Sequence, residues 1–101
     1  SIIERAVEEY LKKMLSLNIV ETLREFRNKA EKVREQELKR AIKGLNQGAS
    51  AEVILESLAR TITNKLIHTP SVQMKKASAE GREELLQLVQ ELYELGDDSK
   101  N

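Results

Sequence analysis

The chain has 101 residues, of which 40% are hydrophobic, 34% are charged and only 3% are aromatic, and its formal net charge at pH 7 is zero. This length fits one domain or an elongated piece of a larger protein, and the abundant Leu, Ala, Glu, Lys and Arg favour helices over strands. The balanced charge gives no general reason to expect nucleic acid or an anionic membrane as a partner, and the absence of cysteine excludes disulfides, thiolate nucleophiles and cysteine-bound metals in this chain.

The first 15 residues predict a helix with a narrow apolar stripe. Its apolar positions recur at spacings of four, three and four residues: Ile3, Val7, Tyr10 and Met14. The helical pattern begins directly at Ser1, without an initiating Met or a cap, so we expect the chain to be a fragment. Acidic residues interrupt this segment, unlike a signal peptide, and no apolar run approaches the ~18 residues of a membrane span. We therefore expect a cytoplasmic protein without a membrane partner.

A second apolar stripe predicts a long helix over residues 18–45, about 42 Å in length. Its members are Ile19, Leu23, Phe26, Ala30, Val33, Leu38, Ala41 and Leu45, with a loss of heptad phase between Val33 and Leu38. Such a helix is longer than a compact domain of this size usually contains, so its stripe needs partners along its length. We expect an all-α, elongated helical bundle with one long helix, which forms a homodimer. The candidate interface residues are Ile19, Leu23, Phe26, Ala30 and Val33.

A turn is predicted at residues 44–50, which read GLNQGAS. Gly48 is suited to a left-handed backbone conformation, Ser50 to capping the next helix and Glu52 to its first turn. The apolar residues between Val53 and Ile67 cover more than half of a helix circumference. We expect that helix to be the most buried element, at the centre of the bundle.

The run His68, Thr69 and Pro70 predicts the end of that helix, with Thr69 capping a short helix that has Pro70 at its first position. Gly81 is expected to interrupt the short helix. A last amphipathic helix then carries Leu85, Leu88, Val89 and Leu92 on its apolar face. Residues 96–101 are expected to be a disordered tail.

No catalytic, cofactor-binding or metal-binding residue is predicted. The four glycines are scattered among helices, without a phosphate-binding loop, and one histidine without cysteine does not supply a zinc site. His68 could act as an acid or base, but we interpret it as an imidazole that satisfies carbonyls at a helix end. Ser57, Thr69 and Ser71 lack a nucleophile pattern, and such residues at turns usually cap helices.

Local charge leaves two further kinds of partner open. Between Glu21 and Lys43 there are eight basic and five acidic residues, so contact with RNA phosphates is conceivable, although no aromatic side chains interleave to stack bases. The alternative functions are therefore a helical module that contacts tRNA and a module that docks a regulatory protein.

Four segments resemble the carboxy-terminal region of bacterial glutamyl-tRNA reductases. Residues 59–72 (ARTITNKLIHTPSV) and 79–86 (AEGREELL) are similar to that family's TNKLLHAP run, its EGR and its final helix. Residues 19–24 (IVETLR) and 34–41 (REQELKRA) match its upstream positions in the same order and spacing. The resemblance covers nearly the whole chain.

The resemblance implies a homodimeric, NADPH-dependent enzyme that reduces glutamyl-tRNA to glutamate 1-semialdehyde in tetrapyrrole biosynthesis. In that family the catalytic Cys and the nicotinamide-binding domain lie outside this region, so this fragment itself would be a non-catalytic homodimerisation module without cofactor. Residues 1–15 would then be the end of a linker (spinal) helix, residues 16–95 the helical dimerisation domain and residues 96–101 the tail.

Overall fold

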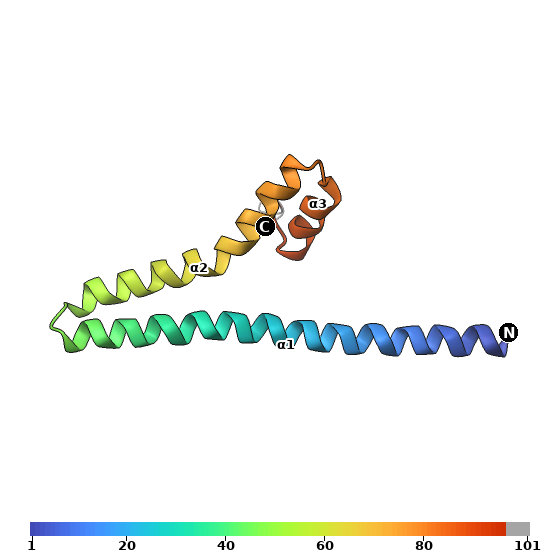
Figure 1. Cartoon of the computed structure of the whole chain (residues 1–101), viewed down its shortest axis with the longest axis horizontal. Helices are drawn as coiled ribbons and strands as arrows, with labels where there is room; N and C mark the ends of the chain where they lie inside the picture. The colour runs from blue at the N-terminus through green and yellow to red at the C-terminus, as the bar shows by residue number, and fades with distance from the viewer. Residues whose placement is uncertain (97–101) are drawn as a thin grey trace. The chain divides into compact units, whose positions relative to one another are not determined.

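The computed structural model describes residues 1–96, and over this range the chain forms three helices joined by short turns (Figure 1). Helix α1 comprises Ile2–Asn46, α2 comprises Ala51–Ala79 and α3 comprises Glu83–Leu92. No strand occurs in residues 1–96. The predicted all-α class with one long helix is confirmed. The predicted tail lies outside the described residues, except for Gly96.

The chain divides into two compact units, one comprising Ser1–Leu58 and the other beginning at Ala59. The first unit therefore contains α1 and the opening turns of α2. The second contains the remainder of α2 and all of α3.

Helix α1 is continuous over 45 residues, so the two helical stretches expected at residues 1–15 and 18–45 form a single helix. No Gly or Pro occurs between Ile2 and Lys43, and therefore nothing interrupts the backbone hydrogen bonds. The expectation of an uncapped start was wrong. The hydroxyl of Ser1 accepts a hydrogen bond from the Glu4 N–H at 3.3 Å, which satisfies one of the free donors of the first turn.

The turn between α1 and α2 has the local chemistry expected from the sequence. Gly48 adopts φ 93°, and its N–H donates to the carbonyl of Leu45 at 3.1 Å while the Ala49 N–H donates to that of Gly44 at 3.1 Å. This pair of bonds is the Schellman motif, which satisfies carbonyls at a helix end. Ser50 then accepts from the Val53 N–H at 3.2 Å. The predicted roles of Gly48 and Ser50 are confirmed.

Helix α2 runs through Pro70 and ends only at Ala79, so the predicted break at residues 68–70 was wrong. Proline removes one backbone donor and crowds the carbonyl four residues earlier, here that of Leu66, but the bonds on both sides maintain the helix. Thr69 consequently lies inside α2 and caps nothing.

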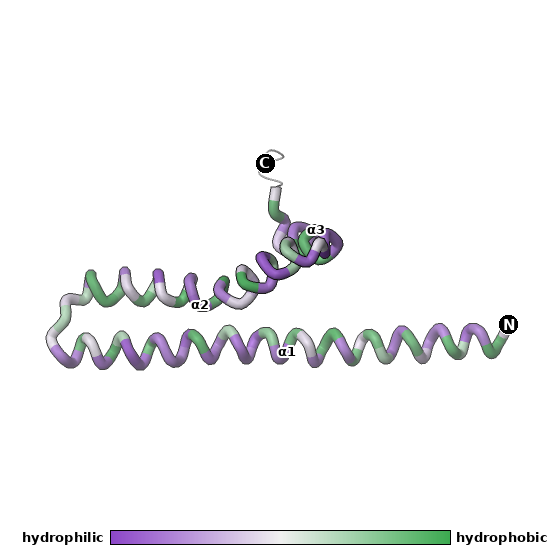
Figure 2. The backbone as a smooth tube through the Cα atoms, turned by 45° about the horizontal axis from the view of Figure 1, so that its top comes forward, coloured by the Kyte–Doolittle hydropathy of each residue, from purple (hydrophilic) through white to green (hydrophobic). Residues whose placement is uncertain are grey.

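Gly81 produces the reversal between α2 and α3, as the sequence predicts. It adopts φ 70°, and the Arg82 N–H donates to the Ala77 carbonyl at 2.8 Å. Helix α3 lies beside the last turns of α2 (Figures 1 and 2). Ala77 is only 1% exposed, because a methyl side chain lets two helix backbones approach closely. The end of α3 repeats the motif with Glu94 at φ 52°, and Leu95 N–H donates to Gln90 at 2.8 Å.

The single chain buries few large apolar side chains. Among residues 1–96 the buried hydrophobic residues are Ala41 and Ala77. Val53, Leu55 and Ile67 are exposed, so the expectation that residues 53–67 form the most buried element was wrong for the isolated chain. An apolar surface that covers more than half of a helix needs several neighbours, and one chain does not supply them.

Candidate association surface

The apolar positions of α1 form two stripes on different faces. The first stripe is Ile3, Val7, Tyr10, Met14 and Leu17, and the second stripe is Ile19, Leu23, Phe26, Ala30 and Val33. Because α1 is unbroken, each residue advances the direction by about 100°, and the mean directions of the two stripes differ by roughly 160°. The stripes therefore lie on nearly opposite faces, and one straight neighbouring helix does not cover both.

The five predicted interface residues share a face, and their exposure changes along it. Ile19, Leu23 and Phe26 are exposed, with Phe26 at 62%, whereas Ala30 and Val33 are partly buried. Because α1 is unbroken, the five residues lie on one face of the helix. Their contact with a second copy remains a prediction.

The face continues toward the turn, where the chain covers it with its own residues. Glu37 is 3% exposed and Ala41 is 8% exposed. A Cβ added at Gly44 would lie 2.6 Å from Ile54 Cδ1, so α1 and the start of α2 approach closely at this point. The second stripe is therefore covered at its carboxy-terminal extension and open at Ile19–Phe26.

Glu37 is the residue that the sequence analysis missed. The apparent loss of phase after Val33 arises because a carboxylate, and not an apolar residue, occupies the next position of the stripe. Leu38, which was assigned to the stripe instead, lies about 100° around the helix. Glu37 Oε1 is 3.4 Å from Arg40 Nη1, and a buried carboxylate requires such partners. Glu37 lies four residues after Val33 and four before Ala41, and this spacing could have identified it as a member of the stripe.

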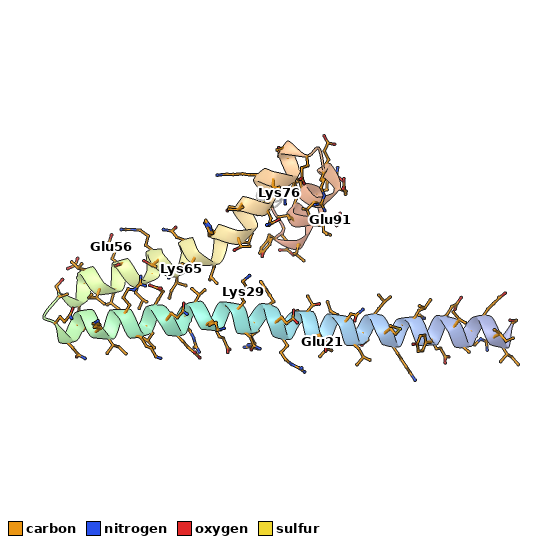
Figure 3. All side chains as sticks on the ribbon, viewed as in Figure 1. Glu21, Lys29, Glu56, Lys65, Lys76 and Glu91 are labelled. Carbon is orange, nitrogen blue, oxygen red and sulfur yellow. The ribbon has the colours of Figure 1, made fainter. Side chains whose placement is uncertain are left out.

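Charged side chains surround the apolar stripes of α1. Figure 3 shows Glu21 and Lys29 extending away from the helix axis. Arg27 Nε lies 3.3 Å from Glu31 Oε1, one turn later on the same helix. Part of the basic character of α1 is thus paired with its own acidic residues.

The polar residues considered as functional candidates in the sequence all lie within α2. His68 is exposed in the interior of α2, so its predicted role at a helix end was wrong, and Ser57, Thr69 and Ser71 also lie within α2 and not at turns. Residues 1–96 contain no group of three or more His, Cys, Asp or Glu that could hold a metal ion. Over the same range no helix has the length and apolar character to cross a membrane.

Residues 1–96 contain a helix of 45 residues, and large apolar side chains remain exposed on more than one of its faces. These features define a helical association module. Sequence comparison identifies which one. The chain belongs to the family described as the glutamyl-tRNA(Glu) reductase dimerisation domain, whose family model matches residues 1–95. The family expected from the sequence motifs is confirmed, and the chain is a non-catalytic part of that family's enzymes.

The curated relatives are named glutamyl-tRNA reductase. That of Marinobacter nauticus is 44% identical over 95 residues, covering 94% of this chain and 22% of the relative. That of Pseudomonas savastanoi pv. phaseolicola is 46% identical over 92 residues, covering 91% of this chain and 22% of the relative. The chain therefore spans about a fifth of the length of these relatives. No solved structure matches it significantly.

Proposed function

We propose that this chain joins two copies of a glutamyl-tRNA reductase and contributes no catalytic group of its own. The observation that carries the proposal is the exposure of Ile19, Leu23 and Phe26 on a face whose extension the chain already buries. Burying one large apolar side chain contributes about 2 kcal/mol, and two-fold symmetry counts each contribution twice. A second copy of the same surface therefore stabilises a dimer.

The proposed interface consists of Ile19, Leu23, Phe26, Ala30 and Val33. Phe26→Asp should dissociate the dimer, because it places a charge in the middle of the apolar contact, while circular dichroism should show that most of the helix is retained. Sedimentation equilibrium at micromolar concentrations measures the mass. Asn28→Asp is the matched control, since it adds the same charge on the opposite face of α1. A Phe26→Asp chain that remains dimeric removes this residue from the interface.

Residues 1–15 are proposed to be the end of a linker helix, and residues 16–95 the dimerisation domain. The apolar face changes direction by roughly 160° between Leu17 and Ile19, close to the proposed boundary, which supports a change of surroundings near this point. The division places the second stripe wholly within the dimerisation domain.

The parent enzyme is proposed to be a cytoplasmic, NADPH-dependent reductase of glutamyl-tRNA in tetrapyrrole biosynthesis, with catalytic and NADPH-binding residues outside this chain. The names of the relatives and the fraction of their length that this chain spans support this assignment. The chain alone should therefore not oxidise NADPH in the presence of glutamyl-tRNA. Measurable oxidation, followed by absorbance, would contradict a purely structural role.

Contact with tRNA or with a regulatory protein is a second proposal, motivated by the basic residues of α1. An electrophoretic shift of tRNA by this chain at low salt, which disappears as salt rises, would support phosphate contacts. Absence of a shift at low salt would remove the tRNA proposal.

A further inference from the structure

We infer that the dimer interface extends to a second apolar surface of α1, the hairpin ridge, which consists of Leu38, Ile42 and Leu45. Its partner is a second copy of this chain. The inference rests on the proposed homodimerisation and specifies which other face of α1 the second copy contacts.

The first step is the size of the surface. Stable protein interfaces bury about 800 Å² per partner and involve roughly 20–30 residues on each side. The exposed parts of Ile19, Leu23 and Phe26 together amount to less than two complete side chains, and Ala30 and Val33 are already partly covered. The second stripe alone therefore supplies only part of the area that a stable dimer buries.

The second step is the obstruction of that stripe beyond Val33. Glu37 and Ala41 are buried by the chain itself, and Ile54 occupies the space beside Gly44. A second copy that packs on Phe26 does not continue along the same face toward the turn. Additional contact on this part of α1 has to come from another side of the helix.

The hairpin ridge is the apolar surface available there. Its residues follow a helical spacing of four and three, and their side chains remain 48%, 48% and 44% exposed in chain order. The ridge lies about 80–140° around the helix from the buried line of Glu37, Ala41 and Gly44. The contact between α1 and the start of α2 therefore leaves the ridge exposed. Exposed Val53 and Leu55 add apolar surface at the start of α2 in the same unit.

Charged residues limit the ridge at its amino-terminal end. Arg34 and Glu31 occupy the preceding positions of this line, and Glu31 pairs with Arg27 at 3.3 Å. An apolar centre with a charged border of both signs is the composition of a protein interface, and it fits a copy of itself without a net charge conflict. The ridge begins five residues after Val33 on the same helix and lies about 100° around from the second stripe. A partner that contacts both surfaces presents two helices to α1.

The test compares substitutions on two faces of α1 in this 101-residue chain. Ile42→Asp should raise the dimer dissociation constant at least tenfold in sedimentation equilibrium, with Gln36→Asp as a control of equal charge on a different face. Dissociation by Phe26→Asp but unaltered dimerisation of Ile42→Asp would overturn the inference and leave the proposed function intact. A wild-type chain that stays monomeric would instead overturn the proposed function.

A second measurement avoids placing a charged residue in the ridge. The chain contains no cysteine, so Ile42→Cys and Gln36→Cys each introduce a single thiol. Alkylation of the thiol at position 42 should slow at least tenfold as the concentration rises through the dimer dissociation constant, while the thiol at position 36 should react at an unchanged rate. Equal rates at position 42 above and below that concentration would overturn the inference.

Discussion

The two ends of the apolar face of α1 differ in the size of the side chains that they present. Toward the turn the face carries Ala41 and Gly44, and there the chain approaches itself closely enough for Ile54 to fill the position of a Cβ. Toward the middle of the helix it carries Leu23 and Phe26, which remain exposed. Small residues thus accompany contact within the chain, and large residues remain exposed, as the proposed dimer requires. Four substitutions test this comparison.

Ala41→Leu should have the largest effect on the chain's own packing. Ala41 is 8% exposed, and a larger side chain there should lower the free energy of unfolding by up to about 3 kcal/mol. Urea denaturation in a Phe26→Asp background separates this loss from any change in dimerisation. Lys39→Leu, at an exposed position, is the control and should change stability by less than about 0.5 kcal/mol. Equal effects of the two substitutions would mean that the contact between α1 and the start of α2 accommodates a larger side chain at position 41.

Leu23→Ala should weaken dimerisation while leaving the unfolding of the monomer nearly unchanged. The chain exposes 57% of Leu23, and a complete burial is worth about 2 kcal/mol, so each copy loses about 1 kcal/mol. Counted twice, the loss raises the dissociation constant roughly 30-fold. Leu17→Ala, on the opposite face, should leave that constant unaltered in sedimentation equilibrium. An equal effect of Leu17→Ala would place both stripes in the interface.

Glu37→Met should leave stability equal or raise it by about 1 kcal/mol, because an apolar side chain of similar length avoids the desolvation of a buried charge. Thermal or urea unfolding in the Phe26→Asp background measures the change in the free energy of unfolding. Glu35→Met, at an exposed position, is the control. A loss greater than about 1 kcal/mol would show that the polar interactions of Glu37, among them the ion pair with Arg40, outweigh its desolvation.

Arg27→Ala should have the smallest effect. The ion pair with Glu31 is exposed, with Arg27 at 80%, and exposed pairs one helical turn apart contribute less than about 0.5 kcal/mol. Raising the salt concentration should abolish even this difference in urea denaturation. A loss of 1 kcal/mol or more that persists at high salt would indicate that the Arg27 side chain packs against an apolar neighbour.

The features decided by local chemistry were predictable from the sequence. The positive φ of Gly48 and the cap at Ser50 depend on residues within one turn of each position, and both predictions were correct. The break at Pro70 was predicted because the residue before a proline disfavours helical dihedrals, but the helical residues on both sides determine whether the helix continues.

Burial was harder to predict because it depends on which chain supplies the cover. The apolar residues around Leu55 predict a buried helix, but one chain leaves that side chain exposed. Glu37 was hidden for a different reason. A polar residue in an apolar stripe looks like a loss of heptad phase. Its place in the stripe is seen only from its spacing of four residues to both Val33 and Ala41.

Because α1 is continuous, the number of residues between its two stripes determines the angle between them. One residue inserted near Asn18 would lengthen the helix by only about 1.5 Å but would turn the first stripe by about 100° relative to the second. An insertion of seven residues would nearly restore the original angle, at a cost of about 10 Å in length. In the proposed dimer, the number of residues between the stripes sets the angle between the second copy and any element that covers the first stripe. Single-residue insertions and deletions in this segment should therefore be far less tolerated than substitutions.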